Sequence, residues 1–136
     1  MSRSLFLLLA GIYGFFLAIP MLFFTESSLL NYGVPKVDLD HIAIMQYLGI
    51  SNAMIGLLFL LNRNQPNSYS LRTVLLLGAL NPLVGVVAGV YHVMVLNVPF
   101  STFFVADTLF RLALGLAFLY YYNRESKAAG ANAVLA

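Results

Sequence analysis

Four long stretches of the chain carry almost no charge, and they constrain the fold more than any other feature. They cover residues 5–24, 42–61, 73–96 and 98–122. A helix that rises about 1.5 Å per residue needs about 20 apolar residues to cross a bilayer core of about 30 Å. The stretches are continuous and do not alternate between polar and apolar residues, as membrane barrel strands do. We therefore predict an all-α fold, in which residues 1–136 form a single domain of four transmembrane helices with short loops.

The composition agrees with a membrane protein. Hydrophobic residues make up 61% of the chain and charged residues 9%, whereas about 25% of a typical soluble domain is charged. Too little chain remains outside the spans for a separate soluble domain. The chain has no cysteine, which excludes disulfides, thiolate metal sites and iron–sulfur clusters. Its small net charge of +2 comes from scattered loop residues, so we do not expect it to bind nucleic acid.

The loop charges predict the orientation. If four helices alternate in direction, five basic residues fall on one side, namely Arg3, Arg63, Arg72, Arg124 and Lys127. The outer loop, residues 25–41, carries Lys36 among three acids. The positive-inside rule then places both termini, with a tail at residues 123–136, on the cytoplasmic side of what we expect to be a bacterial inner membrane. Within the outer loop we predict a short helix that Gly33 ends.

Small and polar residues share one face on each of the later spans. They are Gln46, Gly49, Asn52 and Gly56 in the second span, Asn81, Gly85, Gly89 and His92 in the third, and Asp107, Arg111 and Gly115 in the fourth. Membrane helices associate through small residues and through hydrogen bonds between polar ones. We expect the glycines to pack the helices together. The polar side chains should form one column from the outer boundary to near the bilayer centre.

Asp107 and Arg111 are the only acid and base inside the predicted spans. A lone charge at mid-bilayer costs at least ~2.5–3.5 kcal/mol, and the spacing of four residues allows these two to pair on one helix face. Two interpretations stay open. The pair is a structural pin that fixes the rotation of the fourth span, or it lies in a pocket that opens outward, where Arg111 holds an anion or a polar headgroup, or Asp107 a proton or cation.

The two histidines raise a separate question. His41 and His92 are expected near the same membrane face, and imidazoles are axial ligands of haem or of a chlorophyll-type magnesium. The alternative is that His92 is a packing residue that hydrogen-bonds between helices. We predict no other metal site. The motifs of nucleotide binding, hydrolysis and zinc peptidases are absent from the sequence, so no catalytic residue is assigned.

Three segments carry a resemblance to a known family. They are "ISNAMIGLLFLLNR" at residues 50–63, "LRTVLLLGALNPLVG" at residues 71–85 and "FVADTLFRLALGLAFLY" at residues 104–120. In helix count and charge position, residues 5–122 resemble the DoxX-like group of small four-helix membrane proteins, although Asp107 stands where that group has glutamate. The resemblance implies an all-α bundle and a partner protein, because some members are accessory subunits of membrane oxidoreductases. It transfers no catalytic residue.

We therefore expect a small accessory or interaction subunit of a larger membrane complex. Its partners would be membrane lipids and other membrane subunits or further copies of itself, and a lipid, a quinone or a similar amphiphile would bind in the column. The alternative is a self-contained carrier or enzyme for a small lipophilic substrate that uses the same residues.

Overall fold

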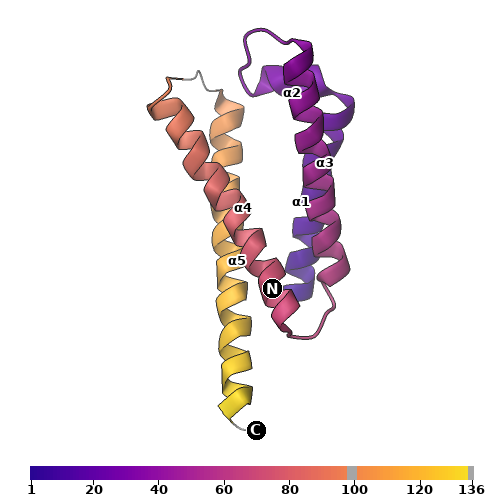
Figure 1. Ribbon diagram of the computed structural model, residues 1–136, viewed down its shortest axis with the longest axis vertical. Coiled ribbons are helices and arrows are strands. Elements are labelled where there is room, and N and C mark those ends of the chain that lie inside the picture. Colours follow the sequence, from indigo (N-terminus) through magenta and orange to yellow (C-terminus); the bar gives the residue numbers. More distant parts are fainter. Residues whose placement is uncertain (98–100, 135–136) are drawn as a thin grey trace.

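The structure is a computed structural model that describes residues 1–97 and 101–134, with side chains up to residue 131. It contains α1 (Arg3–Phe23), α2 (Thr25–Asn31), α3 (Leu39–Asn62), α4 (Tyr69–Met94) and α5 (Thr102–Val134) (Figure 1). All of these except α2 are long and apolar enough to cross a membrane. The prediction of an all-α protein with four membrane spans is therefore confirmed. The membrane and the side on which the termini lie stay predictions. Residues 98–100, where the fourth span was expected to begin, lie outside the described residues.

All four long helices begin at a side-chain cap, and Ser101 caps α5 by accepting a hydrogen bond from the backbone N–H of Phe104 at 3.1 Å. The side-chain oxygens of Ser2, Asp38 and Ser68 accept hydrogen bonds from the backbone N–H three residues on, at 3.2, 2.9 and 3.2 Å respectively. Such caps satisfy backbone donors that have no partner within the helix. They fix the starts of α1, α3 and α4, and each of these three helices starts two to four residues before the predicted span.

Two connecting segments differ in how well they were predicted. The short helix expected in the outer loop is present as α2, and Gly33 follows it with φ of 92°, a left-handed conformation that commonly ends helices. Of the tail expected at residues 123–136, the described part continues α5, which runs to Val134. The reason is that this segment is rich in alanine, the strongest helix former, and contains no proline.

The spans are arranged as two pairs. α1 packs along α3, and α4 packs along α5 as an antiparallel neighbour, whereas α3 and α4 make few contacts (Figure 1). In the first pair the backbones nearly touch. A Cβ atom on Gly14 would lie 2.8 Å from Cα of Gly56, and a Cβ atom on Gly56 would lie 2.8 Å from the carbonyl oxygen of Gly11. Only glycine permits this approach.

The other predicted packing glycines follow the same logic, with one exception. A Cβ atom built on Gly49 would lie 2.9 Å from the Leu22 side chain. One built on Gly89 would lie 3.0 Å from Phe104, and one built on Gly115 would lie 2.6 Å from Leu83. No heavy atom lies within 4 Å of a Cβ atom built on Gly85. The expected packing role of Gly85 is therefore wrong, because α4 diverges from α3 at this level.

One end of the molecule is tightly packed, and we call it the closed end. Its buried core joins α1, α3, α4 and α5 and includes Phe6, Phe59, Leu71, Leu75 and Phe118. Polar contacts complete it. The Glu125 carboxylate accepts from Arg3 at 2.9 Å and from Arg124 at 2.7 Å, and the Asn67 side chain donates to the Glu125 carbonyl at 2.8 Å. The N-terminus, the loop before α4 and the end of α5 are thus fastened together.

From the closed end the two pairs remain joined along one side only. Rings of α1 and the segment after α2 contact rings of α5 at successive levels: Phe6 with Phe118, Tyr13 with Phe110, and Tyr32 with Phe103, with centroids 4.6, 4.5 and 5.0 Å apart. We call this line the α1–α5 seam. On the opposite side α4 diverges from α3 toward the other end of the molecule, the open end (Figure 1).

Candidate ligand-binding groove

Asp107 and Arg111 form an ion pair on α5. The guanidinium Nε donates to Oδ2 of Asp107 at 2.7 Å, and their side chains are 9% and 25% exposed, Asp107 being the more buried. A spacing of four residues stacks the two side chains on one face of the helix. The pairing expected from the sequence is therefore confirmed, and the pair is shielded by protein on most sides.

Two tyrosines complete the surroundings of the Asp107 carboxylate. The Tyr13 hydroxyl of α1 donates to Oδ1 at 3.2 Å, and the Tyr32 hydroxyl, which follows α2, donates to Oδ2 at 3.1 Å. The pKa of Tyr32 is raised from 10.0 to about 12. Burial is the larger cause, and the negative charge of the Asp107 carboxylate is the second. Tyr32 is therefore a hydrogen-bond donor at neutral pH. The carboxylate ties α5 to the α1–α3 pair through these bonds.

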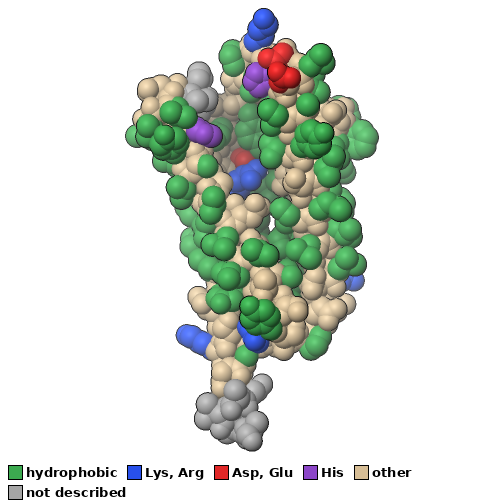
Figure 2. All heavy atoms as spheres, in the orientation of Figure 1, with side chains coloured by type: hydrophobic (Ala, Val, Ile, Leu, Met, Phe, Trp, Pro, Cys, Tyr) green, Lys and Arg blue, Asp and Glu red, His purple; other side chains and the backbone are tan. Residues whose placement is uncertain are grey.

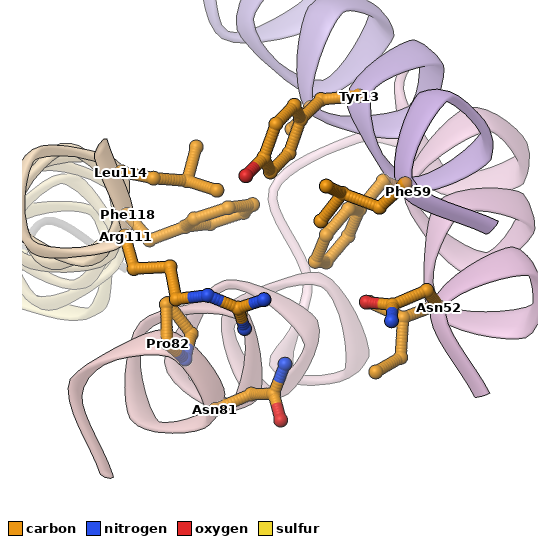
Figure 3. A pocket seen from close by; sticks show the side chains of 13 residues that line it. Tyr13, Asn52, Phe59, Asn81, Pro82, Arg111, Leu114 and Phe118 are labelled. Carbon is orange, nitrogen blue, oxygen red and sulfur yellow. The ribbon is translucent and has the colours of Figure 1, made fainter. Parts of the chain in front are cut away.

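Arg111 retains donors that the ion pair does not use. A guanidinium carries five N–H groups. Among residues 1–97 and 101–134, Nε of Arg111 donates to Asp107, and the guanidinium also interacts with the Tyr32 hydroxyl, which leaves further N–H groups unused. Figure 3 shows the guanidinium pointing into the space between the helices, toward the side-chain amides of Asn81 on α4 and Asn52 on α3. These three residues line a narrow cavity of about 40 Å³. Two amides and a guanidinium from three helices thus face one small volume.

This narrow cavity connects two wider ones through shared residues. Toward the open end it shares Arg111 with a cavity of about 230 Å³, which Asp107, Tyr32 and Thr108 also line. Toward the gap between α3 and α4 it shares Asn81 and Ile55 with an almost wholly apolar cavity of about 460 Å³. We call these three cavities together the α3–α4 groove. Figure 2 shows the hollow between the helix pairs, with an acidic and a basic side chain at its floor.

The groove receives only part of the predicted polar column. Asn52 and Asn81 join Asp107 and Arg111 there, but Gln46 does not. Gln46 lines a separate surface pocket with Thr25 and Glu26. The reason is geometric. The stripe of α3 that contains Gly49 and Gly56 packs on α1, and at about 100° per residue Asn52 and Gln46 lie about 60° to opposite sides of that stripe.

The stripe predicted on α4 also behaves differently at its two ends. Gly78, near the closed end, packs on the Phe118 ring, with a Cβ atom only 2.7 Å away. Gly85 lies on the same face two turns later and lines the groove. His92, near the end of α4, is exposed and lies beside the ring of its neighbour Tyr91, with centroids 6.1 Å apart. Because α4 leaves the bundle here, this face cannot reach the axis, and the expected place of His92 in the column is wrong.

The histidines give no sign of a shared metal site. His41 lies in the first turn of α3, where its Nδ1 is 2.7 Å from the carboxylate of Asp38. His92 lies on the last turn of α4, and no hydrogen bond or ring contact joins the two among the described residues. Nor does the described part of the chain contain a group of three His, Asp or Glu side chains placed to hold a metal ion. Haem or pigment ligation by these residues stays an untested hypothesis.

Sequence reasoning missed Tyr13 and Tyr32. Tyr13 sits in the first span and Tyr32 in the outer loop, and no polar role was predicted for either segment. One signal was present. A mid-membrane carboxylate needs more donors than one arginine nitrogen supplies, and Tyr13 is the only polar side chain in the middle of the first span.

Comparison of the chain with protein-family models, with curated protein sequences and with solved structures finds no match in any of the three. The DoxX-like resemblance therefore stays a hypothesis. The chemistry of the groove rests on its own residues, which offer hydrogen-bond donors beside an apolar chamber.

Proposed function

We propose that this protein is a membrane-embedded binding subunit that holds an amphiphile, such as a lipid or a quinone, in the α3–α4 groove, within a larger membrane assembly. The observation that carries the proposal is the position of Arg111. Its guanidinium points into a cavity that shares wall residues, Asn81 and Ile55 among them, with an apolar chamber of about 460 Å³. Small-molecule sites are typically concave, mostly apolar and supplied with a few convergent polar groups.

The alternative that the pair is purely a structural pin explains less. A pin needs Nε of Arg111 and the hydroxyls of Tyr13 and Tyr32, all three of which donate to the Asp107 carboxylate. It does not require the amides of Asn52 and Asn81 to face the same cavity as the guanidinium. The pin and the site are compatible, because the carboxylate holds Arg111 in place while the rest of the guanidinium faces the groove.

The subunit role rests on the resemblance described above to a group in which some members are accessory subunits of membrane oxidoreductases. Native mass spectrometry of the gently extracted protein tests this part, since it reports retained small molecules and associated subunits together. A protein that emerges as a bare monomer without any bound amphiphile contradicts the proposal.

A pair of amide substitutions tests the site itself. Asn81→Leu removes a side-chain amide from the groove, whereas Gln46→Leu removes one from a pocket elsewhere on the surface. Both residues are exposed in the protein, so both variants should fold. We expect Asn81→Leu to lose co-purified amphiphile and Gln46→Leu to retain it. Equal retention by the two variants would show that the ligand, if any, binds outside the groove.

A further inference from the structure

The charge of the groove restricts the ligand more narrowly than its shape does. Asp107 and Arg111 neutralise each other at 2.7 Å. The other charged side chains of the chain lie outside the central parts of the spans, namely Arg3, Glu26, Lys36, Asp38, Asp40, Arg63, Arg72, Arg124, Glu125 and Lys127. An anionic group entering the groove would thus bring an uncompensated charge into a neutral, weakly polar site. Such a charge costs several kcal/mol in a low-dielectric environment.

The hydrogen-bonding groups left over at the site are mainly donors. The Nη nitrogens of Arg111 make no hydrogen bond of ordinary geometry among the described residues, and the Asn81 amide faces the same cavity. The carboxylate oxygens of Asp107 already accept from Arg111, Tyr13 and Tyr32. The Asn52 amide nitrogen already donates to the Leu48 carbonyl at 2.9 Å. A ligand atom beside Arg111 is therefore best matched when it is an acceptor oxygen.

The depth of the site argues against a lipid headgroup. Arg111 lies about 14 Å along α5 from its first residue, Thr102, at the usual helical rise. In a hydrocarbon core of about 30 Å that is close to the middle. Ionised phosphate groups belong at the membrane surface, so a ligand that meets Arg111 carries its polar atom at a depth where only weakly polar groups reside.

The apolar chamber supplies a place for a chain. It is lined by Ile55, Leu58 and Phe59 of α3 and by Leu77, Leu80 and Val84 of α4. Leu58, Leu77, Leu80 and Val84 are also exposed on the surface that faces lipid, so the chamber opens sideways between α3 and α4. An apolar chain can enter it from the bilayer without passing through the narrow cavity lined by Arg111, Asn52 and Asn81.

We propose that the α3–α4 groove selects a neutral single-chain lipophile that ends in a hydrogen-bond-accepting oxygen, such as a ketone carbonyl, over lipids with an ionised phosphate headgroup. This inference rests on the proposed function, because it names the class of amphiphile that the same groove binds. The acceptor oxygen lies against Arg111 and Asn81, and the chain lies in the apolar chamber.

The test uses the full chain in a nonionic detergent and three probes of similar chain length. They are 2-heptadecanone, palmitoyl lysophosphatidic acid and heptadecane, and binding is measured by titration with native mass spectrometry. We expect the ketone to bind at least tenfold more tightly than either of the other two. Binding of lysophosphatidic acid as tight as that of the ketone, or equal binding of heptadecane, overturns the inference but leaves an amphiphile site in place. Binding of none of the three contradicts the proposed function itself.

A matched pair of valine substitutions locates the binding. Val84 lines the apolar chamber, whereas Val87, one turn along the same helix, is absent from its lining, and both side chains are largely exposed. Val84→Trp fills the chamber and should weaken ketone binding at least tenfold, while Val87→Trp should leave it unchanged. Equal effects of the two substitutions would show that the ketone binds elsewhere on the lipid-facing surface.

Discussion

Removal of the Asp107 carboxylate is the sharpest test of the site. In Asp107→Leu, Arg111 loses its partner and the hydroxyls of Tyr13 and Tyr32 lose their acceptor. Breaking a buried ion pair by removing one member costs about 3–5 kcal/mol of unfolding free energy. Because a quarter of the Arg111 side chain is exposed, we expect a cost below that range, about 2–3 kcal/mol.

The double variant Asp107→Leu/Arg111→Leu should lose much less than the sum of the two single variants. Replacing both members of a pair with apolar residues leaves no unpaired charge, and the remaining cost is that of two half-buried tyrosine hydroxyls without an acceptor, about 0.5–1 kcal/mol each. We therefore expect a coupling energy of about 2–3 kcal/mol between the two positions.

Reversible unfolding in mixed micelles, followed by circular dichroism while the fraction of denaturing detergent rises, measures all four proteins of the cycle. The control cycle pairs Asp107→Leu with Arg72→Leu, because Arg72 lies at the closed end and donates to Asn67 instead. The control should be additive. A coupling between Asp107 and Arg111 no larger than the average of about 0.6 kcal/mol for polar contacts between membrane helices would refute the reasoning.

Three further results are expected. The contribution of Tyr32 to stability should be complete below its unfolded pKa of 10.0 and be lost as the pH rises toward its folded pKa of about 12. The late phase of the tyrosine titration, followed by absorbance at 295 nm, should lose the amplitude of one tyrosine in Tyr32→Phe. Gly56→Leu should destabilise the protein by about 2–3 kcal/mol or prevent folding, because a Cβ atom at this position would lie 2.8 Å from the carbonyl oxygen of Gly11. In the same unfolding assay Gly85→Ala, which has open space around it, should change stability by less than about 1 kcal/mol. Glu125→Gln should cost about 2–4 kcal/mol, because it leaves Arg3 in a largely buried place without its counter-charge, and a shift within about 0.5 kcal/mol would contradict the fastening of the closed end.

The number and kind of the helices could be predicted because membrane spanning imposes a length that is visible in the sequence. The uncharged run at residues 42–61 has the length and composition of a membrane-spanning helix, and α3 covers it. The pairing of Asp107 with Arg111 followed from their spacing, which is a property of a single helix and needs no tertiary information.

Relations between helices were harder to predict. A helical wheel shows that Asn52 and Gln46 share a broad face, but it does not show that α1 occupies the middle of that face and sends the two amides to different sides. It likewise assigns Gly78 and Gly85 to one stripe without indicating that α4 diverges between them. Periodicity gives the direction of a side chain and says nothing about the distance to the next helix.

The divergence of α4 has a mechanical consequence. Since the helices are fastened at the closed end and along the α1–α5 seam, the protein occupies more area in the half of the bilayer near the open end than in the other half (Figure 1). Any swing of α4 toward α3 shrinks its footprint in that one leaflet alone. The lateral pressure of that leaflet would therefore act on any such swing, whereas the fastened closed end offers no comparable change in area.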